Sequence, residues 1–219
     1  MNTPARLPCL IALTLLMCTP CRGFVAVTWL DNPIVLWSPL PAVYESIDID
    51  GNDIVDFIFL ANVSFVGIQA QGGNEYLVWP NPPPMIGGNP EPLLNGFEIG
   101  PDSGEGDLEW FGINTDYSTL IRCLSGSGGP TCAGRFAGQH AYMGIEFDIE
   151  GSIHYGWIDL VVASDVPYAE IYGWGYETDP GVSILAGAGV VPEPSTSMLL
   201  IGGLLTIGCT LRRAKARRG

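Results

Sequence analysis

The clearest hydrophobic pattern in the chain is an alternation over residues 140–149, which is typical of a β-strand. Apolar residues occupy every second position there, and polar residues or Gly stand between most of them. Residues 150–152 (Glu-Gly-Ser) supply a turn, and the apolar run 153–162 predicts a more fully buried return strand. The ranges 169–176 and 182–185 predict further strands.

The middle of the chain is richer in turn residues. Residues 81–84 (Asn-Pro-Pro-Pro) and 87–92 are predicted to form a long surface loop that does not pair in a sheet. Residues 101–107 predict an acidic, Gly-rich loop. Short strands between turns, without long helical periodicity, indicate an all-β fold. We therefore predict one jelly-roll-like β-sandwich domain over residues 24–190.

The first 23 residues read as a secretory signal peptide. Arg6 gives the n-region one positive charge, and residues 7–17 form the apolar h-region. Cys21 and Gly23 stand at the −3 and −1 positions of a cut before Phe24. A lipoprotein signal at Cys18 fits less well, because the preceding Met is larger than such a site prefers.

The last 29 residues, 191–219, have three parts that together predict a sorting signal. Val191, Pro192, Glu193 and Pro194 come first, and the two prolines should keep this segment extended and unpaired. The uncharged run 195–211 would span roughly 26 Å as a helix, close to the ~30 Å hydrocarbon core of a bilayer. Five cations follow and predict a cytoplasmic C-terminus, with the domain outside.

This tail resembles the PEP-CTERM sorting signal of bacterial envelope proteins. The resemblance implies removal of the anchor by an exosortase-type enzyme, and a location in the cell envelope that changes from membrane-anchored to cell-surface or secreted. Residues 154–160, 171–178, 180–181 and 184–187 also look like the closing strands of many uncharacterised PEP-CTERM proteins. That second resemblance implies a shared β fold and no particular activity.

Charge narrows the choice of partners. Between residues 24 and 190 there are two basic residues, Arg122 and Arg135, and 22 acidic ones, which gives a net charge of −20. Such a surface repels nucleic acid and anionic lipid, and divalent cations are its natural counter-charge.

Only two cysteines, Cys123 and Cys132, lie in the predicted domain. In an exported protein a close pair is most simply a disulfide that closes a small loop, worth roughly 2.5–3 kcal/mol. A zinc site is the competing interpretation, but it needs more ligands, and no His is near in the sequence.

Residues 48–57 contain the strongest candidate for a metal-binding site. Oxygen-bearing side chains at positions 1, 3, 5 and 9, with Gly51 at position 4, suit a short calcium loop. The spacing resembles EF-hand-like, dockerin and FG-GAP loops. By that resemblance the side chains of Asp48, Asp50, Asn52 and Asp56, and the backbone carbonyl of Ile54, would bind Ca²⁺.

Two departures weaken the resemblance. Asp53 stands where those loops usually have Gly, and Phe59 occupies position 12, so the bidentate Glu of an EF-hand is missing. The alternative is an acidic β-turn that binds nothing. Further ligands from the acidic segment, Asp102, Glu105, Asp107 and Glu109, are conceivable, although their spacing is unspecific.

Catalytic motifs are scarce. His140 and His154 are the only histidines, and each falls on a predicted strand, where a structural role is commoner than a base. No nucleophile elbow, Walker A loop or zincin helix occurs. A glycosidase carboxylate pair stays an alternative, because the separation of carboxylates is invisible in a sequence.

Strand aromatics near the end of the domain allow two interpretations: core packing, or a platform on which sugar rings stack. They are Tyr155, Trp157, Tyr172, Trp174 and Tyr176. We predict an exported, exosortase-processed, non-catalytic surface or extracellular-matrix protein, with an exopolysaccharide as an expected partner. An exported glycan hydrolase that uses a carboxylate pair is the alternative.

Overall fold

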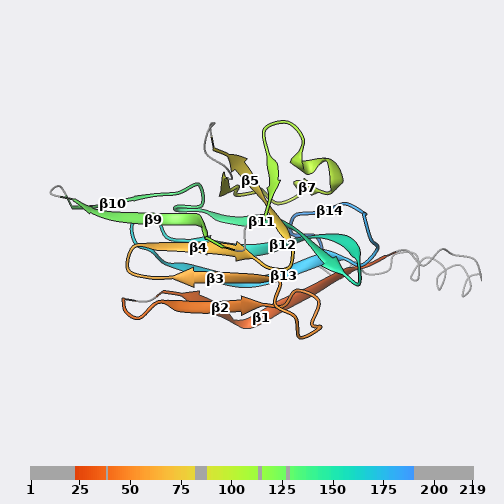
Figure 1. Cartoon of the computed structure of the whole chain (residues 1–219), viewed down its shortest axis with the longest axis horizontal. Helices are drawn as coiled ribbons and strands as arrows, with labels where there is room; N and C mark the ends of the chain where they lie inside the picture. Colours follow the sequence, from red (N-terminus) through yellow and green to blue (C-terminus); the bar gives the residue numbers. More distant parts are fainter. Residues whose placement is uncertain (1–22, 38, 82–87, 113–114, 127–128, 190–219) are drawn as a thin grey trace, which may run out of the picture.

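The computed structural model describes residues 23–37, 39–81, 88–112, 115–126 and 129–189 (Figure 1). The predicted signal peptide, apart from Gly23, and the predicted sorting signal with Val191, Pro192, Glu193 and Pro194 lie outside these residues. Within the described part of the chain, no helix is long and apolar enough to cross a membrane.

The described chain consists mainly of antiparallel β-strands, which confirms the all-β prediction. The only helical element in this part is the short 3-10 helix η1 (Pro101–Gly104). The strands are β1 (Val25–Leu36), β2 (Val43–Ile47), β3 (Phe57–Ala61), β4 (Phe65–Ala70), β5 (Glu75–Pro80), β6 (Gly88–Pro90), β7 (Glu98–Ile99), β8 (Glu109–Phe111), β9 (Ser118–Gly126), β10 (Gly129–Ala133), β11 (His140–Ile149), β12 (Ser152–Val162), β13 (Ala169–Glu177) and β14 (Ile184–Leu185).

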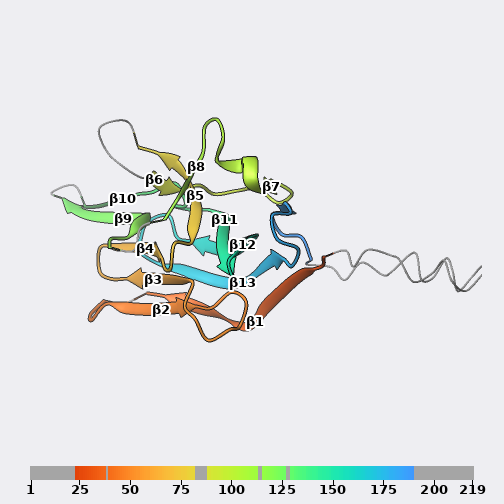
Figure 2. The ribbon, with the colours of Figure 1, turned by 45° about the vertical axis from the view of Figure 1, so that its right-hand side comes forward.

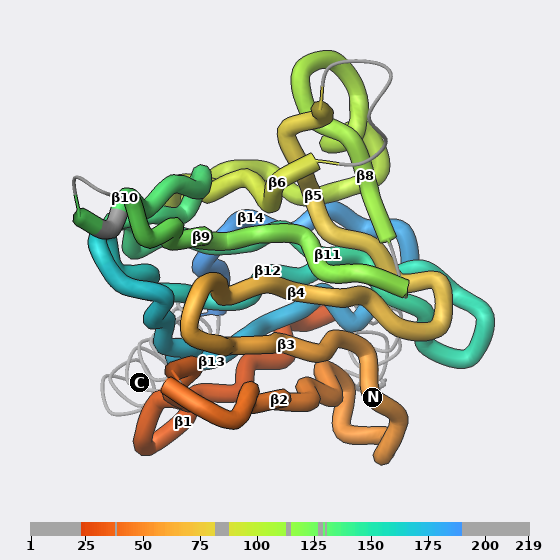
Figure 3. The backbone as a smooth tube through the Cα atoms, turned by 60° about the vertical axis from the view of Figure 1, so that its left-hand side comes forward, coloured from red at the N-terminus to blue at the C-terminus, as the bar shows by residue number. Residues whose placement is uncertain are grey.

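These strands form three antiparallel sheets. Sheet A has seven strands in the order β1–β13–β12–β11–β5–β6, with β8 also paired to β5. Sheet B has five strands in the order β10–β9–β4–β3–β2, and β14 pairs with β7 in a small sheet C. Figures 1 and 3 show sheet B as a layer in front of β11, β12 and β13 of sheet A.

The main hydrophobic core lies between sheets A and B. Phe57 and Phe59 from sheet B and Ile145 and Ile158 from sheet A are completely buried in one cluster. In β11 the alternation holds as predicted, because Ala141, Met143, Ile145 and Phe147 all belong to this cluster. The period-2 geometry of a strand places these side chains on one face.

Part of the other face of sheet A, called the outer face below, is also buried. Leu77, Tyr155 and Trp157 of sheet A form a second cluster with apolar residues from sheet C and its flanking segments, namely Leu93, Ile99, Ile184 and Ala186. Because β12 is covered on both faces, it is buried along most of its length, as its apolar run predicts.

Two strand predictions need correction. Residues 87–92 were expected not to pair, yet Gly88–Pro90 forms β6, with Pro90 opposite Val78. A proline is tolerated there because β6 is the last strand of sheet A and Pro lacks only the N–H that an edge strand can spare. The strand predicted at 182–185 contains only Ile184–Leu185.

Candidate functional site

The predicted calcium loop connects β2 to β3, and its backbone wraps around the side chain of Asp48. The Oδ1 atom of Asp48 accepts hydrogen bonds from the N–H groups of Gly51 (2.8 Å) and Asn52 (3.2 Å). Its Oδ2 atom accepts one from the N–H of Asp53 at 2.7 Å. Gly51 and Asp53 both have positive φ, 78° and 68°, and Asp is one of the few residues that tolerates this conformation. Asp53 therefore fills a position where the resembled loops have Gly without changing the turn.

Three of the five predicted ligands converge in this loop. One carboxylate oxygen from each of Asp48, Asp50 and Asp56 lies within 4.8 Å of the other two. Asn52 is turned toward Asp50, and its Nδ2 donates to Oδ2 of Asp50 at 3.0 Å. The Oδ1 atom of Asn52 accepts a hydrogen bond from the N–H of Ile54 at 2.7 Å.

The three carboxylates sit in different electrostatic environments. Burial and the adjacent Asp48 carboxylate raise the pKa of Asp50. Burial works in the same direction at Asp48, but the surrounding N–H groups hold its pKa below the usual value. Asp56 is only 5% exposed, and its burial raises its pKa from 3.8 to about 6, against the hydrogen bonds that it accepts. A divalent cation would relieve the repulsion that these groups share.

Two residues distant in sequence position this loop, and the spacing of its acids gives no sign of either. Asn74 donates its Nδ2–H to Oδ1 of Asp56 at 2.8 Å, and its own Oδ1 accepts from the N–H of Asp148. Trp174 of β13 donates its indole N–H to the carbonyl of Ile49 at 3.1 Å. The loop is therefore tied both to the start of β5 and to the centre of sheet A.

The acidic segment 101–109 does not join this cluster. Asp102, Glu105 and Asp107 instead line a separate open cavity of about 470 Å³ together with Glu98 and Ser183. Among the described residues, Asp48, Asp50 and Asp56 form the one group of acidic, His or Cys side chains close enough together to hold a metal ion.

Most of the strand aromatics that allowed these two interpretations belong to the protein interior. Tyr155 and Trp157 are buried in the cluster on the outer face of sheet A. Trp174 and Tyr176 pack against the main core on the opposite face. Only Tyr172 lies near an open surface, beside His140 at 6.0 Å between ring centres. Core packing is therefore the correct interpretation for four of the five residues.

A different set of residues forms a row across the outer face of sheet A, beside the second cluster, and only its Trp29 end is exposed. Cross-strand pairing aligns Trp29 of β1 with Gly173 of β13, Gly173 with Asp159 of β12, and Asp159 with Tyr142 of β11. The indole of Trp29 lies over Gly173, where a Cβ atom would stand 2.8 Å from its Cε3 atom. Trp29 is 43% exposed, so one edge of the row presents an open aromatic surface.

The polar member of this row is Asp159, which is only 5% exposed. Its Oδ1 atom is 2.9 Å from Nε2 of His140. Burial raises the pKa of Asp159, and the nearby His140 opposes that shift. Next to them, Glu170 accepts hydrogen bonds from the hydroxyl groups of Tyr168 and Tyr172, which lower its pKa.

The second histidine is structural. His154 is 5% exposed, hydrogen-bonds through Nδ1 to the carbonyl of Glu177 at 2.9 Å, and packs against Phe147 and Tyr176.

One pair of carboxylates meets on sheet A. Glu146 of β11 and Glu75 of β5 are directly opposite in the register of the two strands. Burial, together with a hydrogen bond to Glu75 and the charge of Glu75, raises the pKa of Glu146 to about 7. The cavity next to Glu75 has a volume of about 130 Å³, below the 300–1,000 Å³ typical of ligand pockets.

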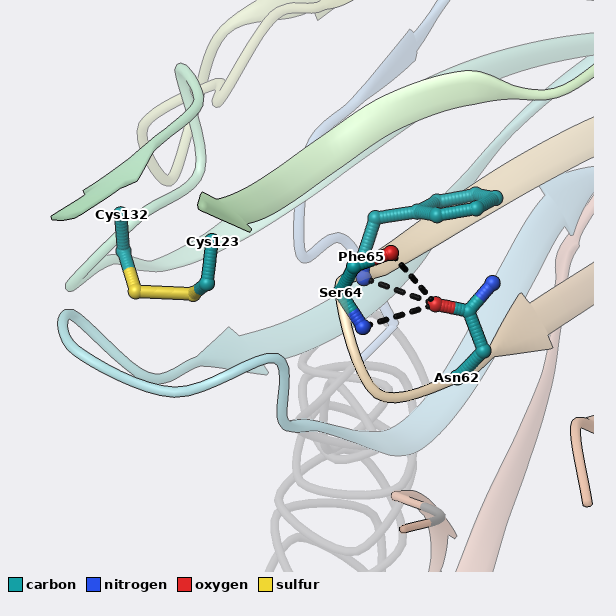
Figure 4. Close-up of a disulfide and its surroundings, with 5 residues drawn as sticks. All are labelled: Asn62, Ser64, Phe65, Cys123 and Cys132. Atoms are coloured by element: carbon teal, nitrogen blue, oxygen red, sulfur yellow. Dashed lines mark hydrogen bonds between the residues drawn. A yellow bond between two sulfur atoms is a disulfide. The ribbon is translucent and has the colours of Figure 1, made fainter. Parts of the chain in front are cut away.

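Cys123 and Cys132 are joined by a disulfide that links β9 to β10 (Figure 4). The two residues are directly opposite each other in the strand register. Figure 4 also shows the neighbouring β3–β4 turn, in which Oδ1 of Asn62 accepts hydrogen bonds from Ser64 and Phe65. The disulfide therefore closes the outer end of sheet B.

The chain matches no family model, no curated protein and no solved structure.

Proposed function

We propose that this chain is an exported, non-catalytic protein of the cell surface or extracellular matrix that binds polysaccharide. In this proposal residues 1–23 direct export, and an exosortase-type enzyme recognises Val191, Pro192, Glu193 and Pro194 and removes the anchor. Residues 24–190 then act as one extracytoplasmic domain, in which sheets A and B form a jelly-roll-like sandwich.

The observation that carries polysaccharide binding is the row Trp29–Gly173–Asp159–Tyr142. An open aromatic surface can stack against the C–H face of a sugar ring, and a neighbouring carboxylate can accept its hydroxyl groups. The four residues lie on adjacent strands, so the row extends roughly 14 Å at about 4.8 Å per strand. Gly173 and Asp159 are buried and Trp29 is 43% exposed, so in this proposal a sugar ring stacks on Trp29 at one end of the row.

Charge restricts the polysaccharide to an uncharged one. The row itself contains the carboxylate of Asp159, and the whole domain has a net charge of −20 from 22 acidic and two basic residues. An acidic polysaccharide would be repelled at such a surface, as would nucleic acid.

Calcium binding at the 48–56 loop is a second part of the proposal. Asp48, Asp50 and Asp56 would contribute carboxylate oxygens, and Asn52 and the carbonyl of Ile54 would complete the set with water. The support is the convergence of three carboxylates within 4.8 Å in a loop that is already closed by backbone hydrogen bonds. Because Trp174 and Asn74 tie the loop to sheet A, bound calcium would stabilise the domain rather than take part in a reaction.

The glycan hydrolase remains the alternative, and Glu75 and Glu146 are the pair that would have to act. Glycosidases hold their carboxylates about 5–10 Å apart so that a sugar, and in inverting enzymes also a water, fits between them. Glu75 and Glu146 instead lie directly opposite each other on neighbouring strands, next to a cavity of about 130 Å³. This geometry favours the binding protein over the hydrolase.

The test is binding of the exported protein to an array of neutral and acidic polysaccharides. Trp29→Ala should weaken binding to a neutral polysaccharide roughly tenfold or more, which corresponds to about 1.4 kcal/mol. Trp79→Ala is the matched control, because Trp79 is also 43% exposed. The guanidinium of Arg135 lies over the Trp79 ring, 4.7 Å from its centre, and so covers the face on which a sugar would stack. Equal loss in both variants, or no neutral polysaccharide bound by the folded protein, would contradict the proposal.

A further inference from the structure

We propose that Glu177, Thr178 and Asp179 form a binding site for a terminal ammonium group, the one created at Phe24 when the signal peptide is removed. This inference rests on the export and leader cleavage of the proposed function. It adds a site that neither the calcium loop nor the aromatic row includes.

The chain around the predicted cut is already held by these residues. β1 begins at Val25, which pairs with Glu177 at the end of β13. One residue earlier, the N–H of Phe24 donates to Oγ1 of Thr178 at 2.9 Å, and the carbonyl of Phe24 accepts from the N–H of Thr178 at 3.1 Å. The nitrogen that would become the new terminus is therefore fixed in position before any cleavage.

Two carboxylates surround the residue on the other side of the predicted cut. The N–H of Gly23 donates to Oδ2 of Asp179. A Cβ atom on Gly23 would lie 2.2 Å from Oε1 of Glu177 and 2.7 Å from Oδ2 of Asp179, so both carboxylates are packed against this glycine. The N–H of Asp179 donates to the same Oε1 atom of Glu177 at 3.1 Å, which orients that side chain.

Cleavage converts the amide nitrogen of Phe24 into a terminal ammonium group. Hydrolysis by a leader-removing peptidase uses one water: its OH joins the carbonyl carbon of Gly23, the C–N bond breaks, and a proton goes to the nitrogen of Phe24. At neutral pH the new amine takes up a further proton and carries three N–H donors and a positive charge. In this proposal one N–H keeps its hydrogen bond to Oγ1 of Thr178, and the other two turn to the carboxylates of Glu177 and Asp179, which Gly23 has left.

The site would fasten the first strand of the domain. β1 is an edge strand of sheet A and carries Trp29, so its position affects the aromatic row. The other processed end lies close by, because a Cβ atom on Gly189 would stand 2.5 Å from Val27 and 2.9 Å from Val25. In Figure 2 the red start of β1 and the blue end of the described chain lie together at one end of the domain.

The titratable groups next to this nitrogen are few. Glu177 and Asp179 come from β13 and the turn after it, and His154 of β12 hydrogen-bonds to the carbonyl of Glu177. The segment 187–189, which packs on the start of β1, contains no titratable residue. The measurement should therefore observe the amine itself.

The composition of the chain makes this measurement simple. The only lysine is Lys215, in the basic end of the predicted sorting signal, so in the processed protein the terminal amine is the only amine. The full-length gene product is exported and recovered, its terminus is identified by intact mass, and the terminal peptide is labelled with an acylating reagent across pH 6–10. We expect a terminus at Phe24 with a pKa about one unit above the ordinary 7.7–8.0, and about tenfold slower labelling at pH 7.

Glu177→Gln with Asp179→Asn keeps the shape of both side chains, and it should return the amine pKa to its ordinary value. Glu105→Gln with Asp107→Asn removes the same charge from an exposed loop and should leave the raised pKa unchanged. A terminus at Phe24 with an ordinary pKa, or a terminus at another residue, overturns the ammonium site but not export. A protein that keeps its leader overturns both.

Discussion

The loop at residues 48–56 and the Glu75–Glu146 pair both bring carboxylates into contact, but they do so in different surroundings. In the loop, Asp48 accepts three backbone N–H groups, and Asp56 accepts the N–H of Ile49 and the amide of Asn74. The glutamates lie opposite each other on neighbouring strands, where burial and the adjacent Glu75 carboxyl raise the pKa of Glu146. The loop therefore suits the proposed cation, whereas the pair suits a shared proton.

The difference shows why the number of acidic residues is a poor guide to a metal site. N–H donors orient carboxylate oxygens and allow them to stay ionised at close range. Without donors, two carboxylates at close range are stable only when one of them is protonated. Three predictions separate the two cases, in order of decreasing effect.

The largest effect is expected from calcium. At a calcium concentration 100 times its dissociation constant, the free energy of unfolding should increase by about 2.7 kcal/mol, measured by thermal or urea denaturation. Asp50→Ala should remove most of this increase, and Asp107→Ala, in the separate acidic cavity, should not.

Magnesium at equal ionic strength is the control for general screening of the acidic surface. If magnesium stabilises the protein as much as calcium, the loop is an acidic turn and the contrast with the glutamate pair disappears.

The second prediction concerns pH in the absence of calcium. The pKa of Asp56 rises from 3.8 to about 6 on folding, and that of Glu146 rises from 4.5 to about 7. Both groups bind a proton more tightly when folded, so their stabilising effect is fully present below pH ~4 and is lost as the pH rises through about 6 and 7. We expect the free energy of unfolding to fall by on the order of 2 kcal/mol between pH 5 and 8, with half-exposed Glu146 contributing the smaller share.

Saturating calcium should flatten the part of this pH profile that belongs to Asp56, and it should leave the part that belongs to Glu146. A calcium-free protein whose stability is constant or increases from pH 5 to 8 would be evidence against both shifts.

The smallest effect is expected at the pair itself. Glu146→Gln removes one of two like charges that face each other across strands, and should raise the free energy of unfolding at pH 8 by roughly 1 kcal/mol. At pH 5 the gain should vanish, because wild-type Glu146 is then already protonated. Glu150→Gln, in the exposed turn after β11, is the matched control and should change stability little at either pH. A gain of equal size at both pH values would mean that repulsion between Glu75 and Glu146 is not its cause.

Local patterns predicted a large part of this molecule. The alternation at 140–149 and the apolar run after it became β11 and β12 with almost the same bounds, because side-chain direction in a strand follows directly from the period of the sequence. Of the five ligands predicted from the spacing at 48–56, the carboxylates of Asp48, Asp50 and Asp56 do converge, because local hydrogen bonds close the turn around Asp48.

Prediction was weaker where a segment depends on a distant partner. The range 87–92 contains β6 because β5 supplies a pairing edge, and nothing within the range indicates that edge. Tyr155 and Trp157 look like the other strand aromatics, yet segments near Leu93 and Ile184 cover them. Asn74 hydrogen-bonds to Asp56 from eighteen residues away. An asparagine in a turn is common, so the sequence gives no sign that Asn74 has this role.

The sequence by itself therefore determined the all-β class, the direction of side chains along its regular strands, and the closing geometry of the 48–56 loop. These features depend on the chirality and period of the backbone and on contacts among residues close in the chain. Only the tertiary structure decided which part of the outer face stays open, which residues stand in the row from Trp29 to Tyr142, and that Glu75 faces Glu146. Each of these depends on strand register between distant segments, where a shift of one residue turns every side chain to the opposite face.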